Sequence, residues 1–434
     1  MTACVLAKRL TDWIVIVLFL SILILPMVTW ILSKDAKFSV NEKRPLNPMP
    51  SLTLIKDASI TRFARDFNNY FGDHFGLREW LIHRYHREVG KRFHVSSLPQ
   101  VLEGKSGWLF FADPSMIRDA RGYLRFSRQK EQAFWTIFSN KTTWLRKRGM
   151  GYLLLIAPNK VSIYPEFAPE YLNRHGAKNR LDHLFTSPYQ SEFPRPIDVR
   201  QQLLKMKKQN RLYSKSDTHW NYLGAMYAFQ ILDQACRKLF PQLPTPTFTF
   251  LKQWQPELGG DLAVMLGRAE DFPETKPVLN RKGFSWRLRP IPAKLKTLLK
   301  LPQLQPLYTV NPKGKLRVLI LRDSFFNHLQ PFVSETFAEA LYIWQYYDSE
   351  TLQFFNQEHL SNLLEIYQPD LVIEEVVERS LANYLPANSW LQQLPIQKKP
   401  VSHNTHISGT IRDNTFPVDN KSSRRVEERH GSKE

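Results

Sequence analysis

Three continuous apolar segments constrain the fold of this 434-residue chain more than any other feature of its sequence. They are GYLLLIAP at 151–158, KLRVLIL at 315–321 and PDLVIEEVV at 369–377. Strands that are apolar along their length are typical of a parallel sheet with helices on both faces, because neither face meets water. Segments with helical spacing, such as 130–149 and 350–367, alternate with them, and a hydrophobic content of 43% is enough for a core. We therefore predict an α/β fold with a parallel sheet.

A further segment, WIVIVLFLSILILPMVTWILS at 13–33, has no charged residue over 21 positions. That length crosses a hydrocarbon core of roughly 30 Å and exceeds the apolar core of a signal peptide, about 7–15 residues. Lys8 and Arg9 precede it, which favours a cytoplasmic N-terminus, although Lys34 and Lys37 on the far side favour the opposite orientation. We predict an uncleaved signal anchor.

The remaining composition excludes several classes of protein. Cys4 and Cys236 are the only cysteines, which rules out a disulfide framework and a cysteine-rich zinc site. The formal net charge of +20 suits an anionic partner such as lipid or an acidic polymer. The basic residues are dispersed, however, and no zinc-finger, basic-zipper or RNA-binding motif is present. We expect no nucleic-acid partner and no cofactor.

A candidate nucleophile follows the strand at 315–321, where the sequence continues as RDSFFNHLQPF. The carboxyl edge of an open α/β sheet is where such folds place ligands. A serine in a sharp turn there, Ser324, can face a base on one side and backbone N–H groups on the other. The alternative is that Ser324 only caps the helix that follows.

A candidate base and its orienting acid lie in KSDTHW, at Asp217 and His219. In an extended segment residues i and i+2 point to the same side, so the carboxylate can set the tautomer of the imidazole. The alternative is a structural histidine bonded to a neighbouring acid. His328 is a rival base, although no acid near it in the sequence would orient it. No second cluster of ligating residues lies near 217–219, so we expect no metal.

An ordered set of motifs resembles the SGNH-hydrolase-like proteins of the alginate O-acetyltransferase group (AlgX/AlgJ type). The motifs are NYFGDHFGLREW near the start, GKSGWLFF at 104–111, KSDTHWNYLGAMYAF at 215–229, GGDLAVMLG at 259–267, RDSFFNHLQPF, and PDLVIEEVVERSL at 369–381. The resemblance covers roughly residues 40–385. It implies that Ser324 is the nucleophile, His219 the general base and Asp217 its orienter. The acid and the histidine precede the serine, a permuted version of the usual SGNH order.

The resemblance also implies a function and a location. It points to acetyl transfer through an acyl-serine to a carbohydrate hydroxyl, on the periplasmic side of a Gram-negative inner membrane. The acetyl group would come from a membrane-bound O-acyltransferase partner, and the acceptor would be a cell-surface or exported polysaccharide. Two alternatives stay open: an acetylesterase, in which water replaces the sugar, and a catalytically inactive glycan-binding or scaffold subunit of an export complex.

The sequence departs from the wider SGNH pattern at two points. Arg322 stands where the glycine of the G-D-S motif would be, which keeps the inactive alternative open. Arg379 stands where the oxyanion asparagine would be, with Glu378 before it, so we expect Arg379 to stabilise the oxyanion and Glu378 to hold Arg379. An ordinary Glu–Arg surface pair is the alternative. Asn159 and Lys160 end the strand at 151–158, and we expect them to line the same cleft.

Three tryptophans are candidate platforms for a sugar ring: Trp108, Trp220 and Trp254. Core packing is the alternative for each of them. We predict that Trp220 and Arg322 contact the substrate.

The chain as a whole is predicted to contain five segments. They are a cytoplasmic N-terminus (1–11), a transmembrane anchor (12–33), a linker with amphipathic helices (34–99), an SGNH-hydrolase-like catalytic domain (100–390) and a polar disordered tail (391–434).

Overall fold

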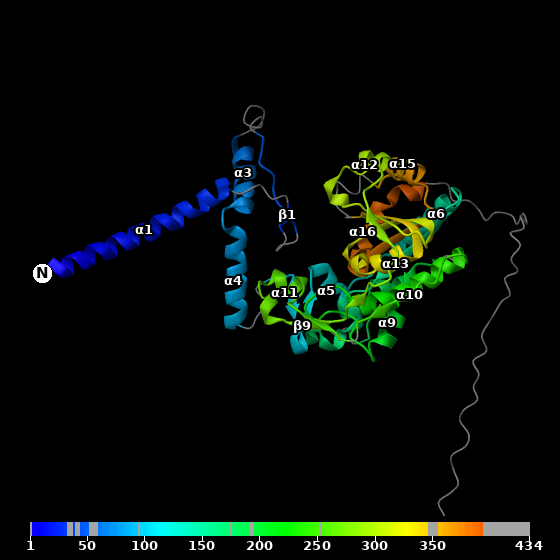
Figure 1. The fold of residues 1–434 in the computed structure, drawn as a ribbon, viewed down its shortest axis with the longest axis horizontal. Coiled ribbons are helices and arrows are strands. Elements are labelled where there is room, and N and C mark those ends of the chain that lie inside the picture. Colours follow the sequence, from blue (N-terminus) through cyan, green and yellow to red (C-terminus); the bar gives the residue numbers. More distant parts are fainter. Residues whose placement is uncertain are drawn as a thin grey trace, which may run out of the picture. The chain divides into compact units, whose positions relative to one another are not determined.

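The computed structural model describes most of the chain (Figure 1). The described residues are 2–32, 38–39, 44–51, 60–93, 96, 98–172, 176–190, 195–251, 253–345 and 355–393. Much of the predicted linker before residue 60 lies outside them. The predicted tail also lies outside them, except for residues 391–393.

A seven-stranded mixed sheet forms the centre of the α/β domain, in the order β11-β12-β14-β13-β15-β5-β6. The strands are β5 Gly151–Ala157, β6 Ile197–Asp198, β11 Arg287–Arg289, β12 Leu307–Val310, β13 Lys315–Arg322, β14 Phe337–Trp344 and β15 Leu371–Val377. The five strands from β14 to β6 are parallel, as predicted. The prediction is wrong at the other edge, where β12 and β11 pair antiparallel. There the outermost strand, β11, is exposed along its length and carries two arginines, so it needs no cover.

The three strands predicted from apolar segments, β5, β13 and β15, lie side by side and are mostly buried. Their side chains alternate between two hydrophobic cores. On β5, Leu153 and Leu155 face one core, whereas Leu154 and Ile156 face the other. Helices α9, α10 and α13 cover the first core, and α6, α12, α15 and α16 cover the second (Figure 1). The domain therefore has three layers, helix on sheet on helix.

The sequence-predicted helices occur close to their expected positions. The α-helices are α1 Thr2–Leu32, α3 Ile60–His74, α4 Arg78–Phe93, α5 Pro114–Ala120, α6 Arg128–Arg146, α7 Lys160–Ile163, α8 Arg180–Phe185, α9 Arg200–Met206, α10 Tyr222–Leu239, α11 Asp261–Met265, α12 Ala293–Leu298, α13 Gln330–Thr336, α15 Gln357–Tyr367 and α16 Leu381–Ala387. The 3-10 helices are η1 Lys105–Gly107, η2 Pro165–Phe167, η3 Glu170–Leu172, η4 Ala269–Asp271, η5 Pro302–Leu304, η6 Ser324–His328, η7 Glu378–Ser380 and η8 Ser389–Gln393.

Short strand pairs complete the described elements. They are β1 Phe38–Ser39 with β2 Arg44–Pro45, β3 Val101–Glu103 with β4 Leu109–Phe111, β7 Thr249–Phe250 with β10 Leu279–Asn280, and β8 Gln255–Glu257 with β9 Glu274–Lys276. The β3–β4 hairpin packs on α11 through a small cluster that includes Val101, Leu109 and Leu262. This contact brings α11 toward the carboxyl end of the central strands.

Helix α1 is the one described helix long and apolar enough to cross a membrane. Its apolar part, Asp12–Leu32, spans 21 residues with a mean hydropathy of 2.8 and is exposed except near Pro26 and Trp30. The predicted apolar N-terminal helix is therefore present.

The folded part of the chain extends past the predicted boundary at residue 390. Helix η8 continues to Gln393, Leu391 is fully buried, and the Asn140 side chain donates a hydrogen bond of 2.8 Å to the Leu391 carbonyl. The sequence after residue 390 is mostly polar, so its composition did not indicate that Leu391 is buried and packs at the end of the domain.

Candidate active site

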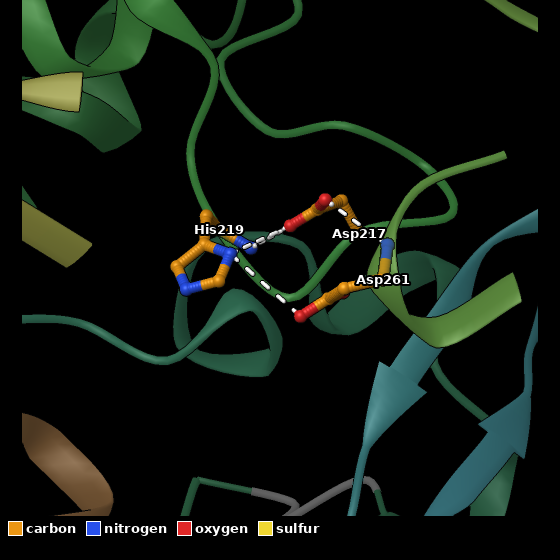
Figure 2. Close-up of side chains that lie close together, drawn as sticks. All are labelled: Asp217, His219 and Asp261. Atoms are coloured by element: carbon orange, nitrogen blue, oxygen red, sulfur yellow. Dashed lines mark hydrogen bonds and ion pairs between the residues drawn. The ribbon is translucent and has the colours of Figure 1, made fainter. Parts of the chain in front are cut away.

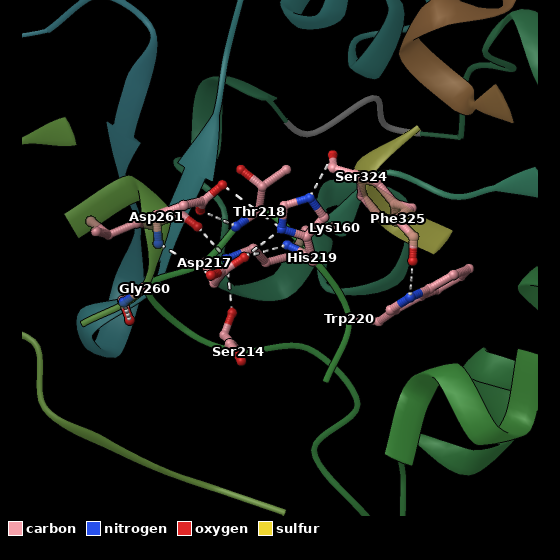
Figure 3. Close-up of polar contacts among 12 residues, drawn as sticks. Lys160, Ser214, Asp217, Thr218, His219, Trp220, Gly260, Asp261, Ser324 and Phe325 are labelled. Atoms are coloured by element: carbon pink, nitrogen blue, oxygen red, sulfur yellow. Dashed lines mark hydrogen bonds and ion pairs between the residues drawn. The ribbon is translucent and has the colours of Figure 1, made fainter. Parts of the chain in front are cut away.

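Ser324 begins η6, directly after β13, at the edge of the sheet predicted to hold ligands. Its neighbour Asp323 caps this helix, because its Oδ1 accepts from the Phe325 amide at 2.8 Å. The other oxygen, Oδ2, accepts from the Val377 amide of β15 at 3.0 Å. The alternative, that Ser324 only caps the helix, is therefore wrong. Its hydroxyl is turned instead to His219, with 2.8 Å between Ser324 Oγ and His219 Nε2 (Figure 3).

The predicted acid and base lie together as the i, i+2 spacing suggested. His219 Nδ1 is 2.7 Å from Asp217 Oδ1, and the same oxygen accepts from the His219 amide at 2.9 Å. Burial by itself would raise the pKa of the Asp217 carboxyl. The hydrogen bonds and the charge of His219, together with the Asp261 amide, outweigh it and hold that pKa well below its ordinary value. Asp217 is thus an anion that fixes the imidazole.

A buried lysine, Lys160, binds backbone carbonyls of the loop that carries this pair. Lys160 Nζ donates to the carbonyls of Leu109, Ser214 and Lys215 at 2.5, 2.9 and 2.9 Å. Burial lowers the pKa of its ammonium group to about 7, an effect that the nearby carboxylate of Asp217 opposes. Lys160 therefore ties the hairpin strand β4 to the loop before Asp217.

Trp220 joins the two halves of the site. Its indole N–H donates to the Phe325 carbonyl at 2.9 Å, and the rings of Trp220 and Phe325 lie edge to face at 5.4 Å. Phe325 also packs against the His219 ring, with 4.9 Å between centroids. The buried rings of Trp220 and Phe325 thus support the contact between Ser324 and His219.

Asp261, which the sequence reasoning did not select, completes the cluster. Its Oδ1 accepts from the Thr218 amide at 2.7 Å, and its Oδ2 lies 3.8 Å from His219 Nδ1 (Figure 2). Ligand atoms of Asp217, His219 and Asp261 lie within 4.8 Å of one another. The sequence expectation concerned neighbours within the chain, whereas the fold brings in Asp261 from over forty positions away. The visible signal was the motif GGDLAVMLG, which contains it.

The rival base, His328, lies close to His219 but has a different environment. Its ring is 6.4 Å from that of His219 and packs edge-on against Tyr222 at 4.7 Å. Burial, with the charge of His219, lowers the pKa of His328 to about 4. Among the described contacts, the hydroxyl of Ser324 bonds His219 rather than His328.

Arg379 and Glu378 do not pair with each other among the described contacts. The buried Glu378 carboxylate accepts from the Asn159 amide at 2.8 Å, the Ser162 hydroxyl at 2.7 Å and the Asn179 side chain at 2.7 Å. Arg379 instead donates to Asn159 Oδ1 at 3.3 Å. Glu378 therefore does not hold Arg379 by a direct contact, and the alternative of a Glu–Arg surface pair is incorrect. Glu378 holds Asn159, and Asn159 contacts Arg379.

A small pocket lies beside the acid–histidine pair. It is lined by Phe110, Phe111, Met116, Asn159, Lys160, Val161, Thr218 and Arg379. Asn159, Lys160 and Arg379 thus line one small pocket together, whereas Ser324 and His219 are not among the residues that line it. The guanidinium of Arg379 stacks between the rings of Phe111 and Phe325, at 5.0 and 5.4 Å from their centroids.

The structure does not support direct substrate contacts by Trp220 and Arg322. Trp220 is completely buried, and Arg322 is only 7% exposed. The Arg322 guanidinium donates to Asn327 Oδ1 at 2.7 Å and lies over the Trp344 ring at 4.6 Å. It braces the turn that carries Ser324.

The other two candidate sugar platforms have different surroundings. Trp108 is buried and stacks on Phe167 at 4.7 Å. Trp254 is half-buried beneath the guanidinium of Arg211, at 5.4 Å. Core packing therefore explains Trp108.

A second acid that the sequence reasoning passed over supports the nucleophile turn. Glu375 on β15 is buried, and its Oε2 accepts from the Asp323 amide at 3.0 Å. Burial, with the negative charge of Asp323, raises the pKa of Glu375 well above its ordinary value. The signal was visible, because two consecutive glutamates interrupt an otherwise apolar strand in PDLVIEEVV.

Comparison with known proteins relates part of this site to a family. Residues 101–287 match the family described as SGNH hydrolase-like domain, acetyltransferase AlgX. That segment contains Asp217, His219 and Asp261 and ends before Ser324. A curated relative, the probable alginate O-acetylase AlgJ of Pseudomonas aeruginosa, is 27% identical over 202 residues, which are 44% of this chain and 48% of the relative. The chain thus matches about half the length of that relative.

Several solved structures are similar to the chain at low identity. Bacillus cereus PatB1 aligns with a TM-score of 0.45 and 13% identity, over 65% of this chain and 97% of PatB1. The O-acetyltransferase domain of Pseudomonas putida AlgJ aligns at 0.40 and 15%, over 68% and 99%. Pseudomonas aeruginosa AlgX aligns at 0.34 and 15%, over 71% and 70%.

The sheet, the serine at the end of its central strand and the matched domain define an SGNH-hydrolase-like protein. Within that class, the matched domain and the AlgJ relative support the AlgX/AlgJ-type, alginate O-acetyltransferase-like family. The resemblance read from the ordered motifs is confirmed.

Proposed function

We propose that this protein is a serine-dependent O-acetyltransferase that carries an acetyl group on Ser324 and passes it to a hydroxyl of a cell-surface or exported polysaccharide. The observation that carries the proposal is the line of contacts from Asp217 through His219 to Ser324, with 2.7 and 2.8 Å between the bonded atoms. A serine, a base and an oriented acid in this order are the parts that acyl transfer through a covalent intermediate requires. The AlgJ relative is named an alginate O-acetylase, which supports acetyl as the group and a polysaccharide as the acceptor.

The first half-reaction loads the serine. Ser324 Oγ attacks the carbonyl carbon of the donor's acetyl group while His219 Nε2 takes the hydroxyl proton. The carbonyl oxygen becomes an oxyanion, and the imidazolium is stabilised by the Asp217 carboxylate. When the tetrahedral intermediate collapses, the donor's leaving group departs with the proton from His219. Ser324 is left as an acetyl ester.

The second half-reaction transfers the acetyl group. A sugar hydroxyl attacks the ester carbonyl as His219 removes its proton, and a second tetrahedral intermediate forms. Its collapse breaks the bond to Ser324 Oγ, which regains a proton from His219. The products are the acetylated sugar and the free serine, so no net proton or electron is consumed.

We further propose that α1 anchors the protein in a Gram-negative inner membrane with the catalytic domain in the periplasm. The support is the uncharged length of α1 and the two basic residues before it, Lys8 and Arg9. In this arrangement a membrane-bound O-acyltransferase partner delivers the acetyl group. The polysaccharide is modified during or after its export.

The experiment that tests the activity is direct trapping of the acyl-enzyme. The full chain in detergent is incubated with an activated acetyl ester, and intact-mass and peptide mass spectrometry locate any adduct. We expect one acetyl group on Ser324, none in Ser324→Ala, and acylation slower by at least about 10³-fold in His219→Ala. Ser115→Ala, which removes a serine hydroxyl on α5 away from the contact chain, is the matched control and should acylate normally.

The fate of the adduct separates the possible activities. Transfer to added acetyl-free oligosaccharide supports the transferase, whereas release only as acetate identifies an esterase. Absence of any adduct in a folded protein, with polysaccharide binding retained in Ser324→Ala, would contradict the proposal and favour a non-catalytic glycan-binding subunit.

A further inference from the structure

We propose that Asp261 is a second orienting carboxylate for His219. Two acids rather than one then position the base of this site and stabilise its protonated form. The inference rests on the proposed acyl-transfer function and adds a positioning residue to it. Asp261 acts through His219 and is not itself placed against the reacting atoms.

The first observation is that two carboxylates converge on one nitrogen. His219 Nδ1 lies 2.7 Å from Asp217 Oδ1 and 3.8 Å from Asp261 Oδ2 (Figure 2). A single N–H forms a short hydrogen bond to one acceptor only, and Asp217 takes it. The contribution of Asp261 is therefore its negative charge, which attracts the positive charge that the ring gains when it accepts a proton.

The second observation is that the fold fixes Asp261 in this position. Asp261 Oδ1 accepts from the Thr218 amide at 2.7 Å, so its Oδ2 is turned toward the ring. In return, the Asp261 amide donates to Asp217 Oδ2 at 3.1 Å. The two acids thus hold each other's backbone segments, one before His219 and one at the start of α11 (Figure 3).

The third observation is the glycine that permits this approach. A Cβ added to Gly260 would lie 2.4 Å from Asp217 Cβ and 2.6 Å from its Oδ2. The Gly260 amide donates to Ser216 Oγ at 2.8 Å, and the amide of Leu262 donates to the Ser216 carbonyl at 3.1 Å. The start of α11 is joined to the catalytic loop at close range, and only glycine leaves room for it.

Other charged groups around His219 do not replace the one on Asp261. Lys160 lies below Asp217 and bonds backbone carbonyls, and His328 has a pKa of about 4 and is neutral at pH 7. Arg379 lines the pocket beside Thr218, and the positive charges of Lys276 and Arg281 act on the neighbouring His328. The positive charges of Lys160 and Arg379 disfavour protonation of the His219 ring. A second carboxylate beside the ring offsets this repulsion.

The test compares charge with structure at position 261. Asp261→Asn keeps an oxygen for the Thr218 amide and removes the charge, whereas Asp261→Ala removes both. Asp271→Asn, which removes a carboxylate on the neighbouring η4, is the matched control. With the acetyl-ester assay, we expect Asp261→Asn to acylate about 10-fold or more slowly than wild type. We expect Asp217→Asn to lose less than the ~10⁴-fold known for a single-acid triad, and the double Asn variant to lose at least that much.

The pH profile distinguishes an electrostatic role from a structural one. Without the Asp261 charge, protonation of His219 becomes less favourable, so the acid limb of the acylation profile should move to lower pH in Asp261→Asn and stay in place in Asp271→Asn. An Asp261→Asn enzyme with wild-type rate and profile, together with a slow Asp261→Ala enzyme, would show that Asp261 only holds the loop and would overturn the inference.

A second readout keeps this inference separate from the proposed function. In a Ser324→Ala background, the rate at which diethyl pyrocarbonate modifies His219 is followed against pH by peptide mass spectrometry. The midpoint should shift to lower pH on Asp261→Asn and not on Asp271→Asn. If wild type forms no acyl-enzyme but this shift occurs, the proposed function fails and the pairing of Asp261 with His219 stands. If no shift occurs, the inference fails whatever the activity.

Discussion

At the scale of single residues, we propose that Arg379 meets the developing oxyanion. Its guanidinium lies between two aromatic rings, on the pocket beside the Asp217–His219 pair, and is steadied by Asn159. A fixed cation aimed at a site of developing charge stabilises a transition state more than a ground state.

We therefore expect Arg379→Ala to slow acetylation of Ser324 by about 10²–10³-fold with little change in folding. Arg379→Lys should recover only part of the rate, because an ammonium group lacks the planar fork that stacks between rings. The measurement is the acylation rate by intact mass, with thermal unfolding as the control for structure. If Arg379→Ala is acetylated at a rate within twofold of wild type, Arg379 does not stabilise the oxyanion and other donors do.

His328 makes the stability of the fold depend on pH. Its pKa is about 4 in the folded protein against an ordinary value of 6.5, so the unfolded chain takes up a proton at a pH where the folded chain does not. The stability that His328 contributes is therefore complete above pH 6.5 and is lost as the pH falls toward 4.

The expected loss from this one group is about 3 kcal/mol between those limits, at 1.36 kcal/mol per pKa unit. His328→Gln should unfold with a flatter dependence on pH across this window, as measured by urea unfolding at several pH values. Subtracting the free energy of unfolding of the variant from that of wild type at each pH removes the contributions of other titrating groups such as Glu375. A difference that is constant from pH 7 to pH 4 would contradict the prediction.

At the scale of elements, a buried ion pair connects α6 to the centre of the sheet. Lys141 Nζ lies 2.6 Å from Glu374 Oε2 and 2.7 Å from Asn388 Oδ1, and the Tyr152 hydroxyl donates to the same glutamate at 2.6 Å. Lys141 is 1% exposed and Glu374 is fully buried. Removing one partner leaves a buried charge without compensation, which is costly.

We expect Lys141→Met to lower the free energy of unfolding by about 3–5 kcal/mol. The double variant Lys141→Met with Glu374→Gln should recover much of that loss, because no buried charge remains. Lys147→Met, at an exposed position just after the same helix, is the control and should change stability by about 0.5 kcal/mol or less. Urea unfolding followed by tryptophan fluorescence measures all three. Equal losses for the single and double variants would show that the charge is not the cause.

At the scale of the whole molecule, the proposed arrangement joins a membrane anchor to a strongly basic chain. The net charge of +20 is spread along the sequence, and a basic surface attracts acidic polymers and anionic headgroups at range. Anchoring keeps the catalytic domain near the membrane across which the proposed donor partner would deliver acetyl groups.

The anchoring is testable by changing only α1. Full-length protein expressed in a Gram-negative cell should stay in the membrane fraction after an alkaline carbonate wash. Replacing Leu20 and Leu23 with arginine at the centre of α1 costs about 2.5–3.5 kcal/mol per residue for insertion and should release the protein. Leu20→Ile with Leu23→Ile is the control and should remain bound. Protease added to spheroplasts should digest the domain after α1; protection of that domain would reverse the proposed orientation.

The sequence by itself determined the features that depend on local patterns. Apolar runs identified β5, β13 and β15, and period and length identified α1, α6 and α15. The i, i+2 spacing of Asp217 and His219 placed both on one side, and a serine after a central strand marked the sheet edge. These features follow from burial and backbone geometry within a few residues, which a linear pattern records.

Only the tertiary structure decided which distant residues meet. Asp261 reaches His219 because the β3–β4 hairpin packs on α11 and Gly260 allows close approach to Asp217. Trp220 proved to be a buried support of the Ser324 turn, and Glu378 bonds Asn159 instead of Arg379. Such contacts depend on how the layers pack and on which buried polar group satisfies which partner. Those choices are made between segments far apart in the chain, where sequence spacing carries no information.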